Sequence, residues 1–189
     1  MNKLILLFSI ILCSISATAQ EDPAILQIRE KFKAWQPLIK SELHGSIELF
    51  HYIWGANYEE TKWYWNELES EDQFLFQKVR IIEKSNRGTF VNYENYSISG
   101  DWRITVDYYF DKSDRLYFVF WRMNTFQAEK PLTVEKRLYF NADGELIKEL
   151  QSTYKMNSKE KSTASFADRE VAYNLQLNKM EFYDFWKGN

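Results

Sequence analysis

The clearest pattern in the chain is a strict alternation of residues from Trp102 to Phe110. Successive side chains of a strand point to opposite faces of a sheet, so this period of two predicts a strand. One predicted face carries Trp102, Ile104, Val106, Tyr108 and Phe110, and the other carries Arg103, Thr105, Asp107 and Tyr109. Residues 116–123 are apolar on both predicted faces, which predicts a second strand near the centre of the sheet.

The turn between these two strands has a counterpart further along the chain. Tyr-Phe-Asp-Lys-Ser-Asp-Arg-Leu at 109–116 aligns with Tyr-Phe-Asn-Ala-Asp-Gly-Glu-Leu at 139–146. Asp114 and Gly144 occupy the same place in the two copies, where a hairpin loop commonly requires a positive φ. Both copies therefore predict strand, turn and strand, as successive hairpins of one antiparallel meander.

Other segments extend this sheet. β-Forming residues at 74–82 and 90–98 flank the polar turn 85–88 and predict another hairpin. Segment 46–65 leaves two interpretations open, because its first half fits a short helix while Trp63-Tyr64-Trp65 is typical of a strand.

Helices are predicted at both ends of the sheet. Asp22 and Pro23 are typical of an N-cap and a first helical residue, and apolar residues follow at helical spacing, with a kink or a division expected at Pro37. After a polar loop at 157–165, a helix is predicted from residue 168 to Gly188. Its expected buried side is Val171, Leu175, Phe182, Phe185 and Trp186. The predicted fold is an α+β domain, an antiparallel β-meander sheet of about five to seven strands flanked by an N-terminal and a C-terminal helix.

Residues 1–19 have the pattern of a signal peptide. Lys3 supplies a positive charge, an apolar run follows, and Ala17-Thr18-Ala19 is a typical cleavage site. The apolar run, about ten to thirteen residues, is shorter than the roughly 20 that a spanning helix needs. A lipid anchor at Cys13 is disfavoured because Leu12 stands where a small residue is expected. The chain is therefore predicted to be exported to the periplasm or the extracellular space, with no membrane span after cleavage.

The remaining residues, 20–189, have the length of a single domain. Cleavage removes Cys13, the only cysteine, so no disulfide, thiol nucleophile or cysteine metal ligand is expected. The formal net charge of the whole chain is −3, which argues against a nucleic-acid partner and does not suggest an anionic one. No cofactor is predicted.

Metal binding has one weak candidate. His44, Glu48 and His51 would share one face of a helix, and imidazole and carboxylate groups suit zinc. Gly45 weakens such a helix, the order differs from a zincin motif, and an extended chain would scatter the three residues. A structural or surface role is the favoured interpretation.

Catalytic signatures are missing from the sequence, which has no nucleophile elbow and no P-loop. A hydrolase that uses His44 and His51, or a pair of carboxylates, stays an alternative. The candidate carboxylates are Glu67, Glu69, Glu71, Asp72, Asp101, Asp107 and Asp111. We therefore favour a protein that is not an enzyme.

Aromatic residues make up 17% of the chain and offer a possible binding surface. Trp63, Trp65, Tyr109 and Trp121 are the candidates, because exposed rings on a sheet can stack on sugars or on a protein partner. The alternative, which we favour, is that these rings pack beneath the flanking helices.

One stretch of the sequence resembles a group of small exported proteins of Bacteroidetes. The resemblance rests on Ser-Gly-Asp-Trp at 99–102, Tyr-Tyr-Phe-Asp at 108–111 and the apolar strand at 116–121. It covers residues 74–122, and Asp114-Arg115 stands where the others tend to have Gly. The group is functionally uncharacterised, so the resemblance implies export and a sheet but no catalytic or binding residue.

The sequence therefore favours a non-enzymatic exported binding domain whose partner is a protein or glycan of the cell envelope. A hydrolase of the envelope is one alternative. An inhibitor or immunity-type protein that binds through the acidic stretch 67–72 is another.

Overall fold

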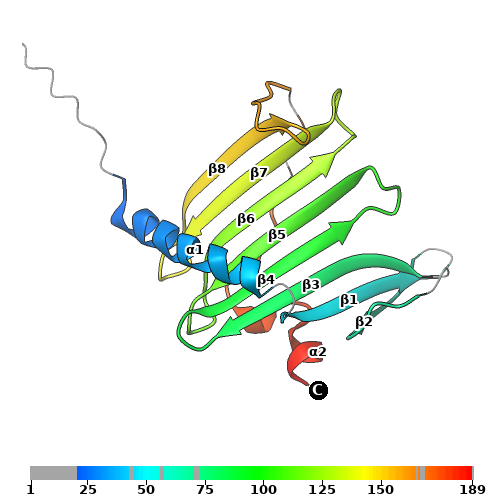
Figure 1. Ribbon diagram of the computed structural model, residues 1–189, viewed down its shortest axis with the longest axis horizontal. Helices are drawn as coiled ribbons and strands as arrows, with labels where there is room; N and C mark the ends of the chain where they lie inside the picture. The colour runs from blue at the N-terminus through cyan, green and yellow to red at the C-terminus, as the bar shows by residue number, and fades with distance from the viewer. Residues whose placement is uncertain are drawn as a thin grey trace, which may run out of the picture.

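A single antiparallel sheet organises the part of the chain that the computed structural model describes, residues 21–42, 45–55, 58–69, 73–164, 166 and 169–188. Within these ranges the sheet has eight strands in the order β2-β1-β3-β4-β5-β6-β7-β8 (Figure 1). The strands are β1 (Ile47–Trp54), β2 (Glu60–Tyr64), β3 (Phe74–Lys84), β4 (Gly88–Tyr96), β5 (Trp102–Phe110), β6 (Leu116–Thr125), β7 (Leu132–Phe140) and β8 (Leu146–Lys155). The predicted α+β class is confirmed, and β3 to β8 follow the predicted meander, whereas β1 lies between β2 and β3. The predicted signal peptide and Cys13 lie outside the described residues.

The prediction of five to seven strands is wrong because segment 46–65 folds as two strands. β1 pairs with β2 on one side and with β3 on the other. The helical interpretation of its first half fails for a local reason: the register with β3 shifts between His51 and Tyr52. Such a bulge breaks the alternation of period two, and both faces of β1 carry buried residues. The resulting spacing of apolar residues is similar to that of a helix.

The two similar turns form as predicted. Asp114 has φ 57° and Gly144 has φ 83°. In the first turn the Asp111 carboxylate accepts hydrogen bonds from the backbone N–H groups of Ser113 at 2.7 Å and Arg115 at 3.1 Å. The Asn141 side-chain oxygen does the same for Asp143 and Glu145 in the second turn. A short polar residue at the start of each turn thus stabilises the turn through hydrogen bonds between its side chain and the backbone.

Helix α1 (Pro23–Ser41) lies across one face of the sheet (Figure 1). Asp22 is its N-cap, as predicted, and the helix runs through Pro37 without being divided. Phe32 contacts the rings of Tyr109 and Phe118 edge to face, and Trp35 is 1% exposed. Burying a large apolar side chain stabilises the fold by about 1.5–3 kcal/mol, so these rings hold α1 on the sheet. We call this the helix face.

The opposite face is covered by the C-terminal segment, which differs from the prediction. Instead of one helix from residue 168, it has a 3₁₀ turn η1 (Leu177–Lys179) and the short α2 (Tyr183–Lys187). Residues 169–176 form no helix, because backbone bonds tie the segment to the sheet: the Leu116 N–H donates to the Leu175 carbonyl, and the Leu177 N–H to that of Asp114.

The expected buried side of this segment is correct in part. Val171, Phe182 and Trp186 are buried, whereas Leu175 is 43% exposed. Gly188 caps α2, as expected for the end of the helix. In the described residues, no helix is both long enough and apolar enough to cross a membrane.

We predict that Gly88→Ala destabilises the protein more than Gly100→Ala. Both glycines have positive φ, 109° and 73°, a conformation that costs an alanine about 1–2 kcal/mol. A Cβ atom at Gly88 would also lie 2.2 Å from the Phe110 carbonyl oxygen, whereas at Gly100 it would meet nothing within 4 Å. Urea unfolding of both variants measures the difference, and equal losses would show that the close approach of β4 and β5 does not constrain residue 88.

Candidate functional site

The helix face divides into two parts. Under α1 it carries the aromatic residues Phe90, Tyr109, Phe118 and Tyr139. Beyond the helix, the same face carries polar and charged side chains on six strands, which we call the polar strip. The polar strip consists of Glu48, Lys78, Arg80, Asn92, Glu94, Tyr96, Arg103, Thr105, Asp107, Arg122, Glu135 and Arg137.

Each glutamate of the polar strip contacts two cations. Glu48 lies 3.0 Å from Lys78 and 2.7 Å from Arg80. Glu94 pairs with Arg80 at 3.1 Å and with Arg103. Glu135 pairs in the same way with Arg122 at 2.8 Å and Arg137 at 3.0 Å. These pairs satisfy the buried carboxylates, which would otherwise be costly to desolvate.

Glu94 and Glu135 are the buried glutamates of the polar strip, each with 8% of its surface exposed. Burial opposes the ionisation of Glu94, but the Tyr96 hydroxyl at 2.6 Å and the guanidinium groups of Arg103 and Arg80 outweigh that effect and hold the pKa of Glu94 below its ordinary value. The same burial and the bond to Glu94 raise the pKa of Tyr96 to about 12. Glu94 is therefore a carboxylate at neutral pH.

Asp107 is different, because within the described ranges no cation pairs with it. Its Oδ1 accepts a hydrogen bond of 2.7 Å from the Asn92 side-chain amide, which lies directly opposite on β4. Burial raises the pKa of Asp107 to about 6, against the opposing influence of Asn92 and Arg122; Glu94 adds to the rise. The side chain is nevertheless only half-buried, so a ligand can reach it. A crowded but accessible carboxyl of this kind is typical of functional sites.

Asn92 adds a second unusual feature. The residue is buried, and its Oδ1 has no hydrogen-bond partner in the described residues. A buried acceptor without a donor costs about 1–3 kcal/mol, so such atoms are rare in stable folds. Asn92 and Asp107 line a cavity of about 230 Å³ whose apolar walls are Ile39, Ile82 and Phe90. The cavity thus offers the Asp107 carboxyl as an acceptor on its polar side and apolar contacts on the other, while Asn92 Oδ1 itself is enclosed.

The two candidate metal residues that the structure describes, Glu48 and His51, are not brought together. Glu48 and His51 lie three positions apart on a strand instead of on one helical face, and Glu48 is engaged by Lys78 and Arg80. The His51 ring stacks on Trp63 at 4.3 Å and its Nδ1 lies 3.1 Å from the Gln77 side-chain oxygen. His44 lies outside the described residues. In the described part of the chain, no group of three metal-binding side chains forms.

The four candidate aromatic residues do not form one surface. Tyr109 is fully buried beneath α1, and Trp121 is 4% exposed on the opposite face. Trp63 packs against the hydrophobic core on that opposite face. Trp65 is 40% exposed and lies beside Phe185. Trp121 does line the floor of a cavity of about 450 Å³ beneath the C-terminal segment. Tyr109 and Trp121 are therefore core residues, which was the favoured interpretation.

Sequence reasoning named Asp107 only as one carboxylate among several, and it did not identify Asn92. The available signal was the position of Asp107 in the middle of a strand with clear alternation, since aspartate is depleted in strands. The pairing of Asp107 with Asn92 follows from the register of β4 and β5, which no local pattern determines.

Comparison with known proteins adds no function. No protein-family model, curated protein or solved structure matches this chain. The resemblance to small exported proteins of Bacteroidetes stays a prediction.

We predict that Asp107→Asn changes how stability depends on pH. The folded-state pKa of about 6 lies above the ordinary value of 3.8, so the folded protein keeps a proton that the unfolded chain has lost between these values. The contribution of Asp107 to the free energy of unfolding of the wild-type protein therefore falls as the pH rises from 3.8 through about 6. Between about pH 4 and pH 7, the free energy of unfolding of the variant relative to that of wild type should rise by on the order of 1–3 kcal/mol, as measured by urea unfolding.

Asp101→Asn is the matched control. Hydrogen bonds from Ser99 and Gln127 lower the pKa of Asp101, so this variant should lose stability relative to wild type as the pH rises. The same sign for both variants would contradict the assignment at Asp107.

Proposed function

We propose that the protein is an exported, non-enzymatic binding domain of the periplasm or cell envelope, and that it binds a glycan at the cavity beside Asp107. The observation that carries this proposal is the Asp107 carboxyl on β5. No cation pairs with this carboxyl in the described residues, and its only hydrogen-bond donor there is the side-chain amide of the buried Asn92 on β4. Export rests on the signal-peptide pattern of residues 1–19.

The chemistry of the cavity suits sugar hydroxyls. Asp107 offers its two carboxyl oxygens, and two adjacent hydroxyl groups of a sugar ring can donate to them. Phe90 and Ile82 provide apolar surface for the C–H groups of the same ring. Such a combination of apolar walls with a few polar groups is typical of small-molecule sites.

The size of the cavity favours a glycan over a protein as the ligand. A cavity of about 230 Å³ admits one sugar ring, whereas a stable protein interface buries about 800 Å² on each partner. An anionic ligand is disfavoured at Asp107, because the carboxylate would repel it at a pH above about 6.

A hydrolase is the second candidate, and one observation favours it. Asp107 and Glu94 line the same cavity and are diagonal neighbours on paired strands, since Asn92 lies opposite Asp107 and Glu94 lies opposite Thr105. Their pKa values are pushed apart, upward for Asp107 and downward for Glu94. This division assigns an acid and an ionised carboxylate, the two roles that glycoside hydrolysis needs.

We predict that Asp107→Asn weakens glycan binding by about tenfold or more, because a hydrogen bond to a charged group contributes about 1.5–3 kcal/mol. The measurement is a thermal-shift and calorimetric screen of residues 20–189 against cell-wall fragments and a glycan panel. Asp101→Asn is the control and should bind like wild type. Equal binding by wild type and both variants would place the glycan elsewhere, and no binding by wild type would overturn the proposal.

A turnover assay separates binding from hydrolysis. We predict that the glycans that bind are recovered intact, as measured by chromatography of the incubated mixture. Release of shorter products would instead support the hydrolase if the rate fell as the pH rose above about 6 and vanished in Asp107→Asn, because an acid must be protonated to act.

A further inference from the structure

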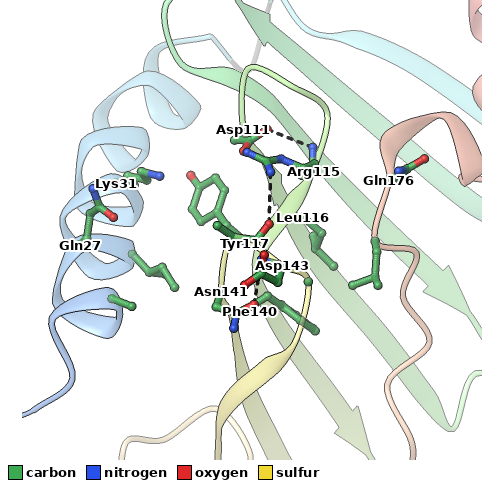
Figure 2. Close-up of a pocket in the computed structure, with 15 residues that line it drawn as sticks. Gln27, Lys31, Asp111, Arg115, Leu116, Tyr117, Phe140, Asn141, Asp143 and Gln176 are labelled. Atoms are coloured by element: carbon green, nitrogen blue, oxygen red, sulfur yellow. Dashed lines mark hydrogen bonds and ion pairs between the residues drawn. The ribbon is translucent and has the colours of Figure 1, made fainter.

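A second hollow lies on the helix face, between α1 and the turns at one end of the sheet (Figure 2). It consists of two cavities of about 360 and 580 Å³, which share Lys31, Asp111 and Tyr117. We call it the helix–turn groove. Its far wall is built by the β3–β4 turn and by the two similar turns that follow β5 and β7. It shares no lining residue with the cavity beside Asp107.

Three cations line the larger cavity of the groove: Lys31 on α1, Arg87 in the β3–β4 turn and Lys112 in the β5–β6 turn. All three are exposed, and none of them has a carboxylate partner in the described part of the chain. The Lys31 ammonium lies 5.1 Å from the centre of the Tyr117 ring, and Arg87 donates to the Ala34 carbonyl at 3.4 Å. Their charge therefore remains available to a ligand.

The carboxylates of this cavity are already engaged. Glu30 pairs with Lys33 at 2.8 Å, and Asp111 pairs with Arg115 at 3.2 Å while it accepts hydrogen bonds from its own turn. Figure 2 shows the Asp111–Arg115 pair on the turn, across from Lys31 and Gln27 on the helix. Asp143 belongs only to the smaller cavity. The field in the larger cavity is therefore positive, and it attracts anions.

The shape and the polar groups favour a peptide over a glycan in the groove. The Tyr117 ring is 6% exposed and its face is occupied by Lys31, so it offers no surface on which a sugar can stack. The amide side chains of Gln27, Asn86 and Gln176 line the groove, and amides can both donate to and accept from a peptide backbone. The cations come from three separate elements, which suits several carboxylates spaced along a chain.

We propose that the helix–turn groove binds an acidic peptide segment of a partner protein. The carboxylates of the segment pair with Lys31, Arg87 and Lys112, and its backbone contacts the amide side chains that line the groove. This inference is independent of the glycan site, because the two sites differ in residues and in the charge of the ligand.

The test measures binding of fluorescein-labelled oligopeptides rich in Glu and Asp by anisotropy, at low and at physiological salt. The double variant Lys31→Glu/Lys112→Glu should weaken binding by about tenfold or more, since it replaces two attractions with two repulsions. Affinity for the wild-type protein should fall as salt is added. The control Lys130→Glu/Lys159→Glu changes net charge equally at exposed positions outside the groove and should bind like wild type.

Three results would overturn the proposal. Equal weakening by both double variants would show attraction to net charge alone. Tighter binding of a uronate oligosaccharide than of any peptide, with loss in the groove variant, would assign the groove to an anionic glycan. Absence of binding by the wild-type protein at low salt would show that the groove is not an acidic-peptide site. Circular dichroism of each variant confirms that the fold is retained.

Discussion

The place where α1 stops covering the sheet determines what the helix face can do. Strand alternation puts Asp107 and Tyr109 on the same face of β5, two residues apart. Tyr109 is fully buried under Phe32, whereas Asp107 lies past the covered region, where Ile39 forms one wall of its cavity. The extent of the helix therefore separates a core position from a candidate binding position on a single strand.

The electrostatics of the polar strip follow from the same boundary. Glu48, Glu94 and Glu135 each lie between two cations, so their charges are satisfied without any ligand. Asp107 lies close to the apolar wall and accepts a hydrogen bond from the Asn92 amide, and the effect of burial on its pKa outweighs the opposing effects of Asn92 and Arg122. An apolar residue at this position would extend the core under α1. Stable folds tolerate such local conflicts mainly at sites that serve a function.

Local chemistry explains which parts of the fold could be predicted from the sequence. The β5 alternation and the turn residues Asp114 and Gly144 act over a few positions, so their patterns predicted strands and hairpins correctly. The bulge after His51 breaks the alternation of β1, so its pattern did not predict a strand. The C-terminal segment is held by backbone hydrogen bonds to a turn far away in the sequence, and residue spacing does not predict such bonds. The pairing of Asp107 with Asn92 depends on strand register, so composition and spacing identified only one of the two residues.

Net charge does not describe how charge is distributed over the surface of the molecule. The formal charge of −3 did not suggest an anionic partner, yet charge is distributed unevenly over the helix face. In the polar strip, the cross-strand register sets glutamates beside the arginines and neutralises them. Along α1, the turns bring Arg87 and Lys112 near Lys31 while Asp111 is held by its own turn. Cations are therefore paired with glutamates in the polar strip and lack carboxylate partners along α1 in the described residues, which is why we propose a different ligand chemistry for each site.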